Sequence, residues 1–149
     1  MPLIDLTLPE GAISPDRSAR LLDDLVTILL RAEKAPDTEF FRGITWTYLH
    51  ELPQHHLAVG GRPGGAPRFR VDITVPAGAL SQRRKDILIG EVHEAVVGAA
   101  GLNPQSEQAL HVWTLIREVP EGNWGAAGQA VKFENLASVA ATERDAINA

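Results

Sequence analysis

The N-terminal stretch Met1-Pro2-Leu3-Ile4-Asp5-Leu6-Thr7-Leu8-Pro9-Glu10-Gly11-Ala12-Ile13-Ser14 has a near copy in the middle of the chain. The copy is Asp72-Ile73-Thr74-Val75-Pro76-Ala77-Gly78-Ala79-Leu80-Ser81. One constant offset of 67 positions relates the matching residues, and the same offset later separates Trp46 from Trp113. A self-match at fixed spacing indicates one supersecondary unit used twice. The sequence therefore predicts a duplicated fold.

Length and composition limit the class of protein. The chain has 149 residues, of which 44% are hydrophobic and 22% charged, as expected for a single soluble globular domain spanning 1–149. Its net charge of −5 argues against a nucleic-acid partner held through phosphates. No apolar run is long enough for a membrane span, and no secretory signal pattern is present, so we expect a cytoplasmic protein with no membrane partner. Because there are no cysteines, disulfides and thiolate metal sites are excluded.

The first repeat, residues 2–61, has the pattern of a β-α-β unit. The apolar run from Leu3 to Leu8 predicts a buried strand, and Ser14-Pro15-Asp16 is a typical helix start. The helix should end before Pro36, and a second strand is expected from Ile44 to Leu52. Two strands joined by such a helix are most simply parallel.

The second repeat, residues 69–133, follows a linker at 62–68 that is rich in Gly and Pro. We expect a strand from Phe69 to Val75, a helix from Ser81 to about Ala99 and a strand from Leu110 to Val119. A tight turn at 122–125 and a short extra strand at 129–133 follow, and residues 134–149 form a C-terminal tail. The fold class is α/β (α+β), with a four-stranded mixed sheet and two helices on one of its faces.

Three features together resemble the tautomerase superfamily, whose founding member is 4-oxalocrotonate tautomerase. They are Pro2 before a short strand, the turn Gly11-Ala12-Ile13-Ser14, and the segment Arg117-Glu118-Val119-Pro120-Glu121-Gly122-Asn123-Trp124-Gly125. The resemblance covers about residues 2–133 and is greatest to the fused subgroup of cis-3-chloroacrylic acid dehalogenase and malonate semialdehyde decarboxylase. It implies a tautomerase-like fold, a homotrimer and chemistry without a cofactor.

The catalytic candidate is Pro2. Removal of Met1 would leave Pro2 with a free secondary amine, and whether Met1 is removed is left open. A free α-amino group titrates near 7.7 to 8.0, and burial in an apolar site lowers that pKa. Such an amine is suited to proton abstraction next to a carbonyl. The alternative interpretation is that Pro2 only begins a strand.

The substrate-binding candidates are two arginines, two tryptophans and one histidine. The arginines that the superfamily uses to bind a substrate carboxylate are missing, since their positions fall on Ala12 or Ala79 and on Trp113. An enolate still needs a cation or a donor, for which Arg117 is the first candidate and Arg70 the second. The remaining candidates are Trp113, His50, the counterpart of Arg117 in the first repeat, and Trp124 as an apolar wall beside the amine. Each is otherwise a surface or packing residue, and no metal site is expected.

Three functions remain open. The first is a cofactor-independent tautomerase or isomerase that acts on a small enolisable keto or enol acid, with Pro2 as general base. The second is a hydratase, dehalogenase or decarboxylase of the same superfamily with protonated Pro2 as acid, for which Glu118 and Glu121 are the only acids expected nearby. The third is a trimeric binding protein without catalysis. The physiological substrate is left open.

Overall fold

A four-stranded mixed sheet organises the chain, in a computed structural model that describes residues 2–149. The strands are β1 (Leu3–Pro9), β2 (Trp46–Leu52), β5 (Phe69–Pro76) and β6 (Val112–Val119), in the order β2-β1-β5-β6. Strands β1 and β2 are parallel, as are β5 and β6, whereas β1 and β5 are antiparallel. The duplicated β-α-β fold expected from the sequence is confirmed.

The register of the two central strands makes the repeat symmetric. Asp5 lies opposite its own counterpart Asp72, with Leu3 opposite Thr74 and Thr7 opposite Arg70. Since Thr74 is the repeat equivalent of Thr7, and Arg70 that of Leu3, the pairing is the same read from either unit. The two copies are therefore related by a pseudo-twofold axis that passes between the two aspartates.

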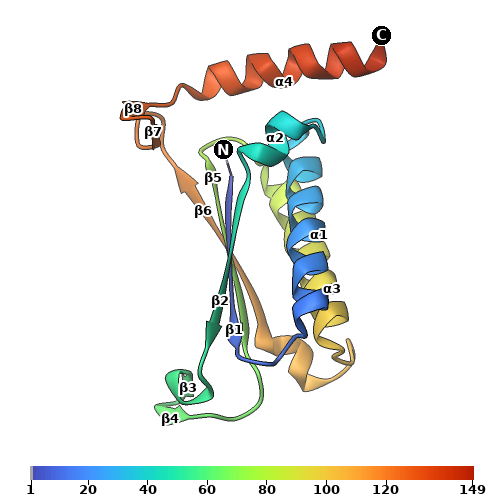
Figure 1. The fold of residues 1–149 in the computed structure, drawn as a ribbon, viewed down its shortest axis with the longest axis vertical. Coiled ribbons are helices and arrows are strands. Elements are labelled where there is room, and N and C mark those ends of the chain that lie inside the picture. Colours follow the sequence, from blue (N-terminus) through green and yellow to red (C-terminus); the bar gives the residue numbers. More distant parts are fainter. Residues whose placement is uncertain (1) are drawn as a thin grey trace.

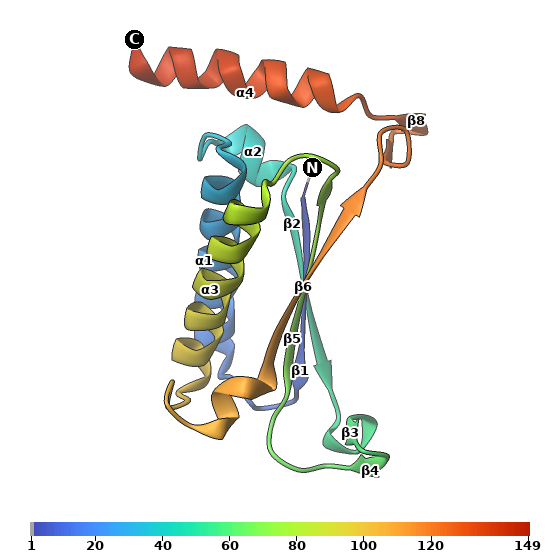
Figure 2. The same cartoon turned by 180° about the vertical axis from the view of Figure 1, so that it is seen from behind.

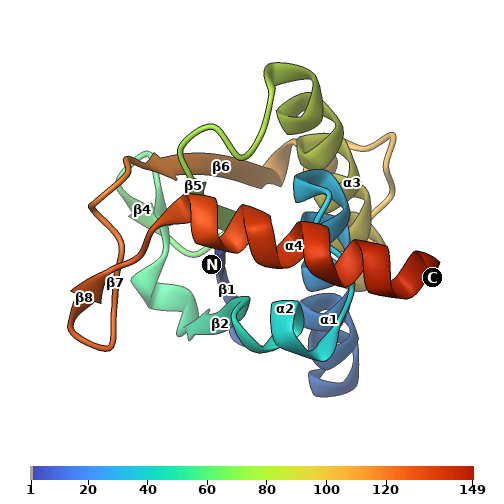
Figure 3. The same ribbon diagram turned by 90° about the horizontal axis from the view of Figure 1, so that it is seen from above.

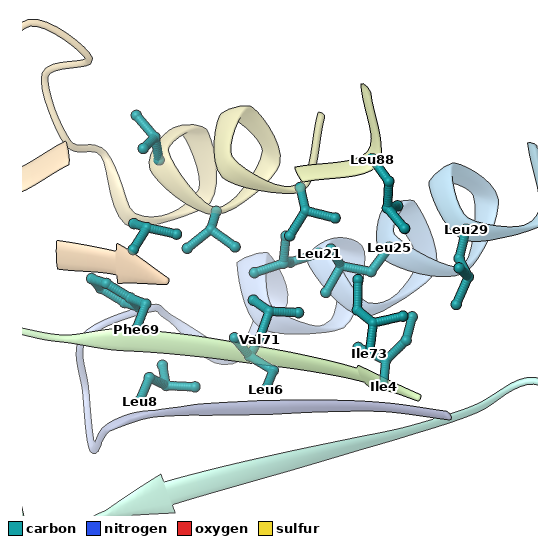
Figure 4. Packing of buried hydrophobic residues seen from close by; sticks show 14 of the residues in the cluster. Ile4, Leu6, Leu8, Leu21, Leu25, Leu29, Phe69, Val71, Ile73 and Leu88 are labelled. Atoms are coloured by element: carbon teal, nitrogen blue, oxygen red, sulfur yellow. The ribbon is translucent and has the colours of Figure 1, made fainter. Parts of the chain in front are cut away.

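Two long helices cover one face of this sheet. They are α1 (Pro15–Glu33) and α3 (Gln82–Ala100), which lie side by side in Figures 1 and 2. Alternate residues of β1 and β5 point toward them because side chains of a strand alternate between its faces. The resulting core, shown in Figure 4, is built from apolar side chains of all these elements, among them Ile4, Leu6, Leu8, Leu21, Leu25, Leu29, Phe69, Val71, Ile73, Leu88, Val92 and Val96.

The helix boundaries follow the expected signals with one difference. Pro15 is the first residue of α1 and Glu33 the last, and the C-cap residue Lys34, whose φ of 58° is left-handed, stands two positions before Pro36. In the second unit the Ser81 hydroxyl accepts a hydrogen bond from the backbone N–H of Arg84. Ser14 occupies the same position before α1, but its side chain makes no capping hydrogen bond.

Short elements connect these parts. Helix α2 (Glu39–Gly43) precedes β2. The 3-10 helix η1 (Gln54–His56) follows β2, and the 3-10 helix η2 (Glu107–His111) precedes β6. The linker region contributes a small hairpin of β3 (Ala58–Val59) and β4 (Arg62–Pro63). The strand expected at 129–133 is shorter than predicted. It is β8 (Gln129–Ala130), paired with β7 (Gly125–Ala126).

A C-terminal helix, α4 (Phe133–Asn148), occupies the region expected to be a tail. It lies across the end of the molecule at which β1 begins, as seen from above in Figure 3. Its buried Ala140 packs in a small apolar cluster with Val26, Leu30 and Phe41. Among residues 2–149, no helix is long and apolar enough to cross a membrane.

The other face of the sheet carries large exposed side chains on both edge strands. Trp46 is 61% exposed and Tyr48 47% exposed on β2, and Trp113 is 68% exposed on β6. The buried Ile, Leu, Val and Phe side chains of β1 and β5 belong to the helix-covered face. We call the opposite side, with these aromatic side chains, the open face.

Candidate functional site

Pro2 lies buried at the head of β1 and lines a cavity of about 870 Å³. The backbone holds it there, because its carbonyl oxygen accepts a hydrogen bond of 3.2 Å from the N–H of Trp46 on the neighbouring strand. Side chains from both repeats complete the lining, which consists of Leu3, Gly43, Ile44, Trp46, Tyr48, Thr74, Val119, Asn123, Trp124, Gly125, Ala126 and Ala127.

We call this space the amine cavity. Aromatic side chains from two parts of the chain form its walls. Trp46 and Tyr48 come from the edge strand β2, and Trp124 stands just before the β7–β8 hairpin. The segment of Trp124 is fixed by its carbonyl, which accepts a hydrogen bond of 2.8 Å from Val131 N–H. No charged residue lines the cavity within the part of the chain that the structure describes. The lining is therefore suited to keeping an amine poorly solvated.

A second cavity, of about 370 Å³, also includes Pro2 in its lining. Its walls are the end of α1, the loop after β5 and the inner side of α4. This cavity contains charged residues, Glu33 among them. Burial raises the pKa of the Glu33 carboxyl to about 7, although part of the residue surface stays accessible. We call this space the α4 cavity.

Glu33 was not expected from the sequence. It is the last residue of α1 and stands four positions after the buried Leu29, itself four positions after the buried Leu25. Residues at that spacing share one helix face. An acid that continues an otherwise apolar stripe was the signal that could have indicated it.

The expected cations lie together on the open face, outside the amine cavity. Arg70, Arg117 and His50 line a third cavity, of about 470 Å³. Both arginines bind the buried carboxylate of Asp72, at 2.6 Å for Arg70 Nε and 2.9 Å for Arg117 Nη2. The third cavity adjoins the amine cavity, since Thr74 lines both of them and pairs with Arg117 in the sheet.

The other sequence candidates fall in different places. His50 Nε2 lies 2.7 Å from an Asp5 carboxylate oxygen. Trp113 is exposed on β6, opposite Arg70 in the register, and is not among the residues that line the three cavities described here. Of the candidates, the structure thus brings Trp124 to Pro2, whereas the others gather on the open face.

The two acids expected near Pro2 have structural partners. Glu118 forms an ion pair of 2.9 Å with Lys85 and accepts a hydrogen bond from Gly78 N–H. These bonds, the one from Lys85 foremost, lower the pKa of the Glu118 carboxyl. Glu121 accepts a hydrogen bond from Phe133 N–H at the start of α4. Across residues 2–149, no group of three His, Cys, Asp or Glu side chains is arranged to hold a metal ion.

Comparisons with known proteins agree with this architecture. Residues 70–134 match the sequence profile of the Tautomerase enzyme family. A search of curated protein sequences found no significant match.

Solved structures resemble nearly the whole chain. Pt0534 inactivated by 2-oxo-3-pentynoate is 19% identical, with a TM-score of 0.73 over 89% of this chain and 98% of its own. The wild-type asymmetric trimer of a fused 4-OT is 22% identical, with a TM-score of 0.70 over 86% and 94%. N1, a member of the cis-3-chloroacrylic acid dehalogenase family, is 20% identical, with a TM-score of 0.69 over 98% of each chain. The resemblance to the tautomerase superfamily is thereby confirmed: residues 70–134 match a Tautomerase family model, and the whole chain has the fold of these solved structures.

Proposed function

We propose that the protein is a cofactor-independent tautomerase or isomerase that moves a proton on a small enolisable keto or enol acid. Pro2 is the general base. The observation that carries the proposal is the position of Pro2, which is buried at the wall of an uncharged, aromatic-lined cavity large enough for a small molecule.

The surroundings of Pro2 suit an amine that works near neutral pH. Once Met1 is removed, Pro2 carries a secondary amine, and a poorly solvated site lowers the pKa of such a group below its usual range. The neutral nitrogen takes a proton from the enol oxygen or from the carbon next to the carbonyl. It then returns a proton to the other atom, so that the double bond moves and the amine is regenerated.

Arg117 is the proposed anchor for the substrate carboxylate. Its strand neighbour Thr74 lines the amine cavity, so the guanidinium stands on the adjoining open face. Its side chain is 65% exposed and shares Asp72 with Arg70. A ligand carboxylate can therefore approach it without displacing a buried group, while the aromatic walls hold the apolar part of the substrate.

The chain is proposed to act as a homotrimer. A fused 4-OT of the same fold is a trimer. The exposed tryptophans of β2 and β6 give the open face the apolar side chains that a subunit contact requires.

The test compares wild type with Pro2→Ala on the enol forms of phenylpyruvate and 2-hydroxymuconate. General-base catalysis is worth about 10² to 10⁴ in rate, and Pro2→Ala replaces the secondary ring amine by a primary one, so kcat/KM should fall by at most that order. Pro63→Ala is the control, because Pro63 is an exposed proline of the β4 hairpin strand. If the wild-type protein converts neither compound faster than buffer alone, the tautomerase proposal fails and the non-catalytic binding protein is favoured instead.

One observation keeps the second candidate function in view. A carboxylate near an amine favours the protonated amine, and Glu33 lines a cavity together with Pro2. A hydratase, dehalogenase or decarboxylase with Pro2 as acid would lose activity as the pH rises and the amine loses its proton. A tautomerase with Pro2 as base gains activity over the same limb, so the direction of the pH profile of kcat/KM distinguishes the two.

A further inference from the structure

We propose that Glu33 is a second proton-transferring group of this site, placed in a compartment of which α4 forms one wall. This inference rests on the proposed function and deepens it. It gives the chain two titratable groups around the reacting atoms, the amine on one element and the carboxyl on another.

The geometry that points to this pair is a shared cavity. Pro2 lines both the uncharged amine cavity and the α4 cavity, and Glu33 lines the second. Pro2 thus lies between an apolar compartment, which suits the body of a substrate, and a polar one, which holds an acid. Two groups that share a cavity with a small substrate can act on different atoms of it.

The environment of Glu33 keeps a proton available near neutral pH. Burial raises the pKa of its carboxyl to about 7, which matches the requirement for a group that gives and takes a proton at cellular pH. The other charged residues that line the same cavity are Lys34, directly after α1, and Glu134 and Arg144 on α4. The loop after β5 adds only uncharged residues to the lining, Pro76 to Ala79.

Helix α4 produces this environment. The Arg144 guanidinium donates a hydrogen bond of 2.7 Å to the Lys34 carbonyl, directly beside Glu33 in the chain. The adjacent Glu143 accepts a hydrogen bond from the hydroxyl of Thr38, which joins the same turn of α4 to the segment after α1. Ala140 of α4 packs in the apolar cluster with Val26, Leu30 and Phe41, so that the helix forms one wall of the compartment beside the end of α1.

The proton balance of one turnover is simple for an enol that becomes a ketone. Pro2 nitrogen takes the enol O–H proton while the Glu33 carboxyl gives its proton to the carbon. The O–H bonds of enol and carboxyl break, the N–H and C–H bonds form, and the C=C electron pair becomes the new C–H bond as C=O forms. The amine then passes its extra proton to the Glu33 carboxylate, which restores both groups without any further reactant.

The first experiment replaces Glu33 by Gln, which keeps the shape of the side chain and removes its proton chemistry. We expect kcat to fall at least tenfold with a KM change below twofold, and the pH profile to lose the limb near neutral pH. Asp24→Asn is the matched control, since Asp24 is an exposed acid on the same helix. Unchanged kcat and an unchanged pH profile in Glu33→Gln overturn the proposal.

A second readout does not depend on activity. In protein labelled with ¹⁵N-proline, and shown by mass spectrometry to begin at Pro2, the nitrogen of Pro2 is titrated by NMR. Two titratable groups that lie close together titrate jointly, so Glu33→Gln should shift the titration curve of the Pro2 amine and Asp24→Asn should leave it unchanged. Equal titration curves in wild type and Glu33→Gln contradict the pairing. If the wild type is inactive but this shift is seen, the proposed function fails while the pairing of the two groups stands.

Discussion

Burial of the Glu33 carboxyl lowers the free energy of unfolding at neutral pH. Its folded-state pKa of about 7 exceeds the ordinary value of 4.5, so the folded protein binds this proton more tightly than the unfolded chain does. The free energy of unfolding therefore falls as the pH rises through the window between those two values, and the loss is complete above it. A group that destabilises the protein at neutral pH is typical of functional sites.

Replacing that carboxyl should stabilise the protein above neutral pH. We expect Glu33→Gln to raise the free energy of unfolding at pH 8 by up to about 3 kcal/mol, since one pKa unit corresponds to about 1.4 kcal/mol, and to change it little at pH 4.5. Urea unfolding of wild type and variant at the two pH values measures this. Asp24→Asn serves again as control, and an equal effect of Glu33→Gln at both pH values would contradict the buried acid.

Arg117 and Arg70 provide a matched pair at the same scale. Both bind Asp72, but only Arg117 pairs in the sheet with Thr74 of the amine cavity. If Arg117 anchors the substrate carboxylate, Arg117→Ala should raise KM about tenfold or more, because a charge-assisted hydrogen bond contributes about 1.5 to 3 kcal/mol. Arg70→Ala should change KM less than threefold. Steady-state kinetics on a keto acid decides it, and equal effects of the two substitutions would exclude this assignment.

At the scale of elements, α4 (Phe133–Asn148) is a long helix with few buried contacts. Its one buried residue is Ala140, with Val139 partly buried beside it, and hydrogen bonds join the helix to Thr38, Lys34 and Glu121. Local stability follows the apolar surface buried, so α4 should open more readily than the strands and helices of the core. The same helix forms a wall of the α4 cavity, and its opening would admit water to Glu33.

A charge inside the small apolar cluster should detach this helix. We expect Ala140→Glu to increase hydrogen exchange throughout 133–148 while the amides of β1 and β5 stay protected, because burying an unpaired carboxylate is unfavourable. The proposed tautomerase activity should fall as well. Ala141→Glu is the control, because Ala141 follows Ala140 on the same helix and is exposed. Full protection of 133–148 in Ala140→Glu would show that the cluster does not hold α4.

For the whole molecule, the open face is the surface that remains to be covered. Trp46 and Trp113 expose most of their side chains on opposite edges of the sheet, while Asp72 between them is buried and paired with two arginines. Large aromatic side chains around a satisfied polar centre are typical of a surface that another subunit covers.

The assembly prediction concerns that face alone. We expect wild type to elute as a trimer in size-exclusion chromatography with light scattering, and Trp113→Glu to shift it toward monomer, because a carboxylate would then be buried in the contact. Leu110→Glu is the control, since Leu110 is 74% exposed on η2, outside the sheet. A trimer of undiminished stability in Trp113→Glu would place the contact elsewhere.

The repeat made the fold predictable, whereas the site was predictable only in part. Apolar periodicity and the constant offset identify β1, α1, β2 and their copies because these signals are local. Pro2 and Trp124 could be named as candidates from their residue types, and both line the amine cavity. The surroundings of Glu33 were missed because they depend on contacts between residues as far apart in the sequence as Lys34 and Arg144. Helix α4 was missed because only one of its residues is buried, so its sequence carries a weak apolar periodicity.

The central claim is that the Pro2 nitrogen is free, uncharged at pH 7 and reactive within the amine cavity. Its most direct test is incubation with 2-oxo-3-pentynoate, the compound that inactivates the related Pt0534, followed by mass spectrometry of the peptides. A free neutral amine adds to the activated alkyne by forming an N–C bond, so we predict one adduct, on Pro2, whose formation phenylpyruvate slows. A retained Met1, or modification of lysines with Pro2 untouched, would contradict the account.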